Sequence, residues 1–245
     1  MREDNIGFGG LKLLQEPEEF CYGVDAVILA DFAAGVNPKK AVDLGTGSGI
    51  IPMILSHKTD AEKILGVEVQ EASAKRAADS VKLNGLENRI SIVGSDILAE
   101  GLKEKILEEM GAPEGVDLVT SNPPYMPGDA SIPGNNIAKT IARRETTAKL
   151  EDFVRVAGEL LCRRGHFFMV HRPSRMVDIC CFMRKYGLEP KELRMVSPRA
   201  GAEPNILLIH GIKGAGPELR VLDTLCVHGE GDSYTDEIER IYERK

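Results

Sequence analysis

Short apolar runs alternate with longer amphipathic segments along most of the 245-residue chain. Short apolar runs bounded by turn residues are typical of buried strands, and apolar positions at helical spacing are typical of helices. The pattern predicts strands at residues 40–44, 63–68, 90–94, 116–121, 165–171, 190–196 and 205–212. It predicts helices at residues 26–35, 49–58, 71–84, 101–110, 150–163 and 174–187.

Strands and helices that alternate in this way favour an α/β fold, in which a mostly parallel sheet carries helices on both faces. We therefore expect a seven-stranded sheet within a single domain that spans residues 1–245. Its parts would be an entry segment at 1–35, a core at 36–213 and a tail at 214–245. Ligands of such sheets bind beyond the carboxyl ends of the strands, so polar residues at those ends are site candidates.

The most informative strand end follows residues 116–121 and reads Asn122-Pro123-Pro124-Tyr125. Asn122 offers a side-chain carbonyl, and Pro123 has no N–H, so its turn presents carbonyl oxygen. Tyr125 adds a ring on which a planar group can stack. Two acceptors that hold the hydrogens of a base amino group or a carboxamide would localise the lone pair on its nitrogen. The turn predicts a site for a planar amino group, but such a short motif is equally consistent with a proline-stiffened strand end.

The predicted strand at 40–44 carries one acid, Asp43, and leads into a glycine-rich loop. The loop consists of Gly45, Thr46, Gly47, Ser48 and Gly49. Its glycines let the backbone approach a ligand closely. The dinucleotide fingerprint would need a further glycine where the chain has Ile50, and an acid beside the loop would repel phosphate. Asp43 instead suits a ligand with an ammonium group, such as the aminoacyl end of S-adenosylmethionine.

Two further predicted strands end in or near an acid. Glu68 lies about twenty residues beyond the glycine loop, the spacing at which an acid reaches ribose hydroxyls. Asp96 follows the strand at 90–94 and would accept a hydrogen bond from an adenine amino group, with Ile97 packed on the ring.

In this order, the four elements resemble the class I S-adenosylmethionine-dependent methyltransferases, and the turn at Asn122 resembles the group that methylates planar amino nitrogens. The resemblance covers about residues 20–213. A narrower resemblance is to the tRNA adenine-N6 methyltransferases that modify the adenine next to a valine-tRNA anticodon. It is carried by residues 19–32, 141–152, 234–237 and 241–242. The chain departs from that family at Arg144, where the family usually has His.

The resemblance implies a Rossmann-like class I methyltransferase fold, S-adenosyl-L-methionine as the cofactor, and N6-methylation of an adenine in the anticodon-loop region of tRNA. The expected catalytic residues are Asn122, Pro123, Pro124 and Tyr125. The expected cofactor-binding residues are Asp43, Gly45, Thr46, Gly47, Gly49, Glu68, Val69, Asp96, Ile97 and Asn122.

Other substrates fit the same turn. Glutamine methyltransferases of translation release factors and guanine-N2 rRNA enzymes use it as well. The release-factor enzymes usually carry a helical domain before the glycine loop, whereas only a short segment precedes Asp43 here. Methylation of adenine in DNA also stays open, although no target-recognition domain is evident. A non-catalytic binder is disfavoured because Asp43, Glu68 and the turn are all intact.

The formal net charge of −7 argues against an RNA partner. The charge is unevenly distributed along the chain, however. Residues 1–129 carry 12 basic and 22 acidic side chains, whereas residues 130–220 carry 16 basic and 9 acidic ones. The basic region follows the Asn122 turn, as the electrostatic footprint of a nucleic acid would. We therefore expect Arg143, Arg144 and Arg172 to bind the substrate. Residues 126–149 form a predicted loop rich in Gly, Pro and Asn, which we expect to cover that substrate.

Cysteine and histidine usage bounds the remaining possibilities. The five cysteines show no CxxC pair, so reduced thiols in a cytoplasmic protein are the better interpretation. The five histidines have no ligand-like spacing, and we expect no metal site. No apolar run is long enough to span a membrane, and the first residues lack the layout of a secretion signal. The sequence does not indicate an oligomeric state.

Overall fold

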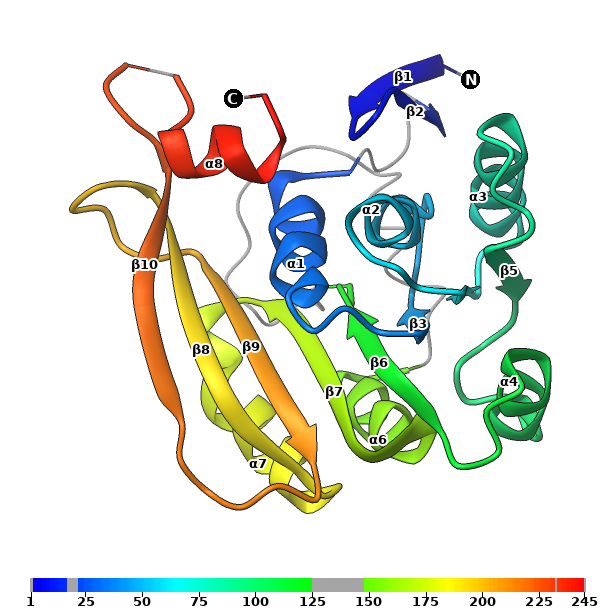
Figure 1. The fold of residues 1–245 in the computed structure, drawn as a ribbon. Coiled ribbons are helices and arrows are strands. Elements are labelled where there is room, and N and C mark those ends of the chain that lie inside the picture. Colours follow the sequence, from blue (N-terminus) through cyan, green and yellow to red (C-terminus); the bar gives the residue numbers. More distant parts are fainter. Residues whose placement is uncertain (1, 17–21, 125–147, 232, 245) are drawn as a thin grey trace.

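A computed structural model describes residues 2–16, 22–124, 148–231 and 233–244. The main sheet contains β3 (Lys40–Leu44), β4 (Lys63–Glu68), β5 (Ile90–Gly94), β6 (Val116–Ser121), β7 (Leu161–His171), β8 (Leu188–Arg199), β9 (Ile206–Lys213) and β10 (Arg220–His228). Their order across the sheet is β10-β8-β9-β7-β6-β3-β4-β5 (Figure 1). Only the two pairs that involve β9 are antiparallel, which confirms the predicted mostly parallel sheet.

The predicted number of seven strands is wrong, because the tail contributes an eighth. β10 pairs in parallel with β8 at the edge of the sheet. Its register shifts between Leu222 and Leu225, so the apolar alternation that marks a strand is interrupted. The predicted helix at 150–163 is also too long, because Leu161 already pairs with Val116 of β6.

Helices cover both faces of the sheet, as predicted (Figure 1). One face carries α1 (Val24–Ala34), α2 (Ile50–Lys58) and α3 (Glu71–Leu83). The other carries α4 (Leu102–Met110), α6 (Leu150–Leu160) and α7 (Met176–Lys185), preceded by the short 3-10 helix η1 (Pro173–Arg175). The helix α8 (Asp236–Ile241) follows β10. No helix within the described ranges is long and apolar enough to cross a membrane.

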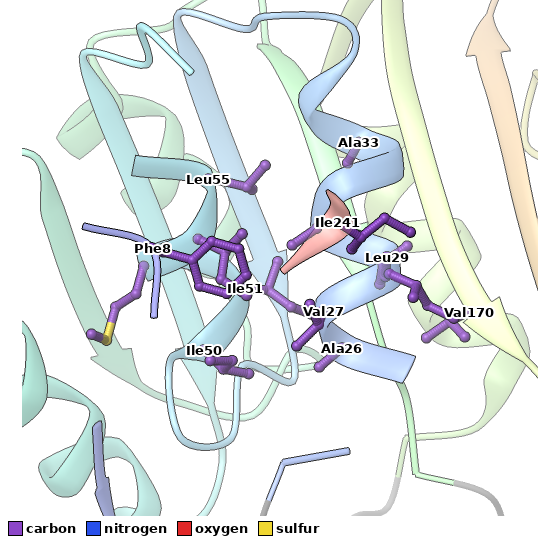
Figure 2. Close-up of a cluster of buried hydrophobic side chains, with 14 of the residues drawn as sticks. Phe8, Ala26, Val27, Leu29, Ala33, Ile50, Ile51, Leu55, Val170 and Ile241 are labelled. Carbon is purple, nitrogen blue, oxygen red and sulfur yellow. The ribbon is translucent and has the colours of Figure 1, made fainter. Parts of the chain in front are cut away.

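The sequence analysis missed an N-terminal hairpin of β1 (Arg2–Gly7) and β2 (Leu11–Gln15). Figure 2 shows how Phe8 at its turn and Ile241 of α8 join side chains of α1 and α2 in one buried cluster. Phe8 also stacks on Tyr242, with ring centroids 6.2 Å apart. Both ends of the chain therefore pack on the helical layer that covers this face of the sheet.

Candidate active site at the strand ends

The carboxyl ends of β3, β4 and β6 lie side by side, because β3 is the middle strand of these three. The parallel registers place Asp43 opposite Thr120 of β6 and Gly66 of β4. They also place Glu68, the last residue of β4, opposite Gly94 of β5. One edge of the sheet therefore collects the strand ends that carry the predicted site residues.

The glycine loop after β3 is anchored on β4 by its backbone. The amides of Gly45 and Thr46 both donate to the Val67 carbonyl, each at 2.9 Å. Gly47 has a φ of 56°, in the left-handed region that favours glycine, and a Cβ at this position would meet nothing within 4 Å. Gly49 is also left-handed and begins α2. The loop thus exposes the backbone of Gly47 to open space beside the strand ends.

Glu68 fixes the tip of this loop. Its carboxylate accepts from the Gly47 amide at 2.8 Å and from the Gln70 amide at 2.9 Å, one bond on each oxygen. A carboxylate oxygen has more than one lone-pair site, so Glu68 keeps the capacity to accept from a ligand hydroxyl as well. The side chain is nevertheless buried.

Asp43 is buried among the strand ends with only part of its hydrogen-bonding capacity used. Thr120 Oγ1 donates to Asp43 Oδ1 at 2.7 Å. Asp43 Oδ2 and the Thr46 hydroxyl have no hydrogen-bond partner within the part of the chain that the structure describes. Buried polar groups are rarely left unpaired in folded proteins. A polar ligand group at this place would satisfy both atoms.

Burial, with a smaller contribution from the charge of Glu68, raises the pKa of Asp43 to about 6. Thr46 and Thr120 act in the opposite direction, because their hydroxyls favour the charged carboxylate. The Thr46 hydroxyl is close enough to influence the pKa of Asp43 but makes no hydrogen bond with it, so Oδ2 has no partner among the described residues. A cationic ligand group beside Oδ2 would stabilise the ionised form.

The predicted adenine-binding residues, Asp96 and Ile97, follow β5, the strand beside β4 at the end of the sheet order. Asp96 follows β5, and its Oδ1 accepts from the Leu98 amide at 2.9 Å. Ile97 is buried in the core between the sheet and α4. Val69, which follows β4, is partly buried. The contacts of these residues with a cofactor stay a prediction.

The Asn122 turn begins where β6 is tied to β3. Ser121 Oγ donates to the Leu44 carbonyl at 2.9 Å. Asn122 and Pro124 are partly exposed and Pro123 is buried. No hydrogen bond joins the Asn122 side chain to another described residue, and Asn122 is only partly buried.

Three of the predicted substrate and catalytic residues, Tyr125, Arg143 and Arg144, lie outside the described residues, as does most of the loop predicted at 126–149. Arg172 follows β7 at the same edge of the sheet as Asn122. Its guanidinium donates to the Asn205 carbonyl at 3.2 Å. The role of Arg172 in substrate binding stays a prediction.

Sequence reasoning missed Thr120 as the partner of Asp43. The available signal was a hydroxyl in an otherwise apolar strand, directly before the Asn122 turn. Among the described residues, no cluster of three or more His, Cys, Asp or Glu side chains could hold a metal ion.

Relatives with known names support a methyltransferase. The chain is 29% identical over 227 residues to a tRNA1(Val) (adenine(37)-N6)-methyltransferase of Porphyromonas gingivalis, covering 90% of this chain and 86% of the relative. It is 28% identical to the enzyme of the same name from Aeromonas salmonicida, covering 87% and 85%. A crystal structure of a predicted O-methyltransferase from Agrobacterium tumefaciens shares the fold, with a TM-score of 0.68 and 22% identity over 89% of this chain and 95% of that one.

The family model described as the methyltransferase small domain matches residues 24–180, which is more than half of the chain. The match spans the glycine loop, the acidic strand ends and the Asn122 turn. It confirms the predicted class I methyltransferase fold, the predicted enzyme class and S-adenosyl-L-methionine as the cofactor. The chain belongs to the methyltransferase small domain family.

Proposed function

We propose that this enzyme methylates the N6 amino group of an adenine in the anticodon-loop region of tRNA, in the cytoplasm. The observation that carries the proposal is the position of Asn122, which follows β6 directly beside the strand ends that hold Asp43 and Glu68. The relatives from Porphyromonas and Aeromonas support the choice of substrate, since both are named for methylation of adenine 37 in a valine tRNA.

The residues at the strand ends fit S-adenosylmethionine, which supplies an electrophilic methyl group when bound. The unpaired Asp43 Oδ2 suits the ammonium of its aminoacyl end, and the Thr46 hydroxyl lies beside it without a partner among the described residues. Glu68 retains lone pairs for ribose hydroxyls while it holds the Gly47 amide. The open space at Gly47 lets a ligand approach the backbone closely. Asp96 and Ile97 would border the adenine.

The Asn122 turn would act on the amine that receives the methyl group. The Asn122 side-chain carbonyl and the Pro123 backbone carbonyl accept its two hydrogens, which localises the lone pair on nitrogen and aims it. Tyr125 stacks on the base. Because the methylated amine becomes acidic, it loses its proton without a strong general base. Positioning therefore provides most of the rate enhancement.

A single-stranded loop is the favourable substrate for such a pocket, because an unpaired base costs least to extrude. Arg143, Arg144 and Arg172 would bind its phosphates. The competing substrate class is the glutamine side chain of a translation release factor, whose carboxamide fits the same two acceptors.

Methylation assays with the purified enzyme separate these substrates. Deproteinised tRNA and a release factor are offered in parallel, and the products are digested and identified by mass spectrometry. We expect N6-methyladenosine from tRNA and no methylglutamine from the release factor. Turnover on the release factor with none on tRNA would overturn the proposal.

The variant pair Asn122→Ala and Asn122→Asp tests the turn in the same assay. Asn122→Ala should lose methyl transfer by at least about a hundredfold while cofactor affinity stays unchanged, because the lost acceptor acts on the target amine. Asn122→Asp keeps an acceptor oxygen and should retain part of the activity. Full activity in the alanine variant would remove Asn122 from the chemistry.

Salt dependence tests the basic residues. Affinity for tRNA should fall linearly with salt on a log–log plot, by roughly 0.7–0.9 per phosphate contact. The double variant Arg143→Ala and Arg144→Ala should make that slope shallower by about one to two. Arg184→Ala is the matched control, because Arg184 ends α7 at the opposite edge of the sheet and pairs with Glu189. A slope changed equally by the control would exclude a specific role for Arg143 and Arg144.

A further inference from the structure

Two hydroxyl side chains follow one another at the buried end of β6 and serve different acceptors of β3. Thr120 Oγ1 donates to the Asp43 carboxylate at 2.7 Å, whereas Ser121 Oγ donates to the Leu44 backbone carbonyl at 2.9 Å. Both residues are fully buried. The parallel register sets this pairing, since Asp43 lies opposite Thr120 and Leu44 lies opposite Ser121. Only the Thr120 hydroxyl reaches an ionisable group.

A hydrogen bond to one oxygen of a carboxylate has two consequences. It favours the ionised form, because a hydroxyl donates more strongly to a negative oxygen. It also restricts rotation of the carboxylate, so that the second oxygen points in one direction. In Asp43 that second oxygen is Oδ2, which is buried and has no partner among the described residues.

We propose that Thr120 is a positioning residue, which keeps Asp43 ionised and turns its free oxygen toward the ammonium group of the methyl donor. This inference rests on the proposed cofactor site at Asp43. It extends that site to a fully buried residue whose hydroxyl bonds to the Asp43 carboxylate. Thr120 also stands two positions before Asn122 on the same strand end. One strand therefore positions the residue that holds the methyl donor and carries the residue that holds the acceptor.

The electrostatic surroundings of Asp43 give this hydrogen bond its effect. Burial and the charge of Glu68, from the neighbouring strand, raise the pKa of Asp43 to about 6. Thr46, from the glycine loop, and Thr120, from β6, oppose that rise. Without the Thr120 donor the pKa of Asp43 rises further, so the carboxylate is protonated over more of the range below neutral pH. Affinity for an ammonium group falls in both proteins as pH is lowered. Without the Thr120 donor, this loss of affinity begins at a higher pH than in the parent.

Titration calorimetry with S-adenosylhomocysteine tests the inference without any RNA or turnover. The proteins compared are the parent, Thr120→Val, Thr120→Ser and Ser121→Ala. Thr120→Val removes the hydroxyl and keeps the shape, Thr120→Ser restores a donor, and Ser121→Ala removes the neighbouring buried hydroxyl that does not reach Asp43. Circular dichroism and melting temperature confirm that each variant is folded.

We expect Thr120→Val to bind about fivefold more weakly than the parent at pH 6 and less than about twofold more weakly at pH 7.5. The amino group of the ligand titrates alike for every protein, so it cancels from these ratios. Thr120→Ser should follow the parent at both pH values. Ser121→Ala should change affinity by the same factor at both. A Thr120→Val ratio that does not change with pH would overturn the inference that Thr120 keeps Asp43 ionised, and parent-like binding at both pH values would overturn its positioning role as well.

A second ligand shows whether the ammonium group is the target. 5′-Methylthioadenosine keeps the nucleoside and the thioether but lacks the aminoacyl chain. We expect Thr120→Val to bind it as the parent does at both pH values. An equal loss of affinity for both ligands would show a general disturbance of the pocket and overturn the inference. If the parent binds neither ligand, the proposed cofactor site is wrong. If the parent binds both ligands and Thr120→Val binds them equally well, only the role of Thr120 is wrong.

Discussion

The ends of β3 and β4 lie side by side, and each carries a buried carboxylate, yet the chain satisfies the two very differently. Glu68 receives backbone hydrogen bonds on both oxygens, from Gly47 and Gln70. Asp43 receives one hydrogen bond, from Thr120, and its Oδ2 has no partner within the described ranges. Glu68 therefore stabilises the glycine loop without a ligand, whereas Asp43 keeps one buried oxygen that the proposed cofactor would satisfy.

Glu68 therefore has a structural role in the site, whereas the ionised form of Asp43 is destabilised by its burial. Asp43 has a pKa of about 6, above its usual value of 3.8, so the folded protein binds the Asp43 proton more tightly than the unfolded chain does. The contribution of Asp43 to the free energy of unfolding is therefore fully present below the pKa of the unfolded chain, and it is lost as pH rises through about 6. At neutral pH the free protein carries a buried charge on Asp43 that costs stability and that the proposed cofactor would offset.

Replacement of Glu68 should have the largest effect, because it removes a structural and a binding role together. Glu68→Ala leaves two backbone amides without their carboxylate, and we expect the free energy of unfolding to fall by about 3 kcal/mol. Cofactor affinity should fall by about a hundredfold. Urea denaturation and calorimetry measure the two effects. Glu62→Ala, which removes an exposed acid paired with Lys39, is the control and should change neither. If Glu68→Ala is as stable as the parent, Glu68 does not stabilise the glycine loop and does not differ from Asp43 in this respect.

Replacement of Asp43 should separate binding from stability. Asp43→Asn keeps the shape and removes the charge, so cofactor affinity should fall about tenfold. The free protein should become more stable at pH 7.5, by about 1–3 kcal/mol, and this gain should shrink at pH 4. Urea denaturation of both proteins at the two pH values measures it. A variant less stable than the parent at pH 7.5 would contradict a strained Asp43.

Replacement of Gly47 should have the smallest effect and shows whether the loop faces a ligand. Gly47→Ala forces a side chain into the left-handed region, at a cost of about 1 kcal/mol, and places a methyl group in open space. Gly85→Ala is the matched control, because Gly85 is also left-handed and open but follows α3. Both variants should lose similar stability, and only Gly47→Ala should weaken cofactor binding. Equal affinities in the two would mean that the open side of Gly47 is not the ligand side.

The strand ends of this site were predictable because their signals are local. An apolar run followed by glycines, an acid or the Asn122 turn can be recognised one element at a time. The bond between Thr120 and Asp43 was not predictable in that way, because it depends on the register of two strands 77 positions apart in the sequence. The same limit explains why the different hydrogen bonding of Asp43 and Glu68 could not be predicted.

The periphery was predicted less well for a related reason. The residues of β1 are mostly polar, and the strand forms because Ile6 and Phe8 reach a core built by distant helices. The bulge in β10 hides its alternation, so this edge strand is identified only by its pairing with β8. Such elements depend on tertiary contacts, which override local propensity.

The central claim is that this chain methylates an adenine of tRNA, and nucleosides from cellular tRNA test it most directly. The measurement is mass spectrometry of tRNA digests from cells with the gene, without it, and with the Asn122→Ala variant restored in its place. The account predicts that N6-methyladenosine in a valine tRNA is lost without the gene, returns with the parent and does not return with the variant. An unchanged level of N6-methyladenosine in the cells that lack the gene would contradict it.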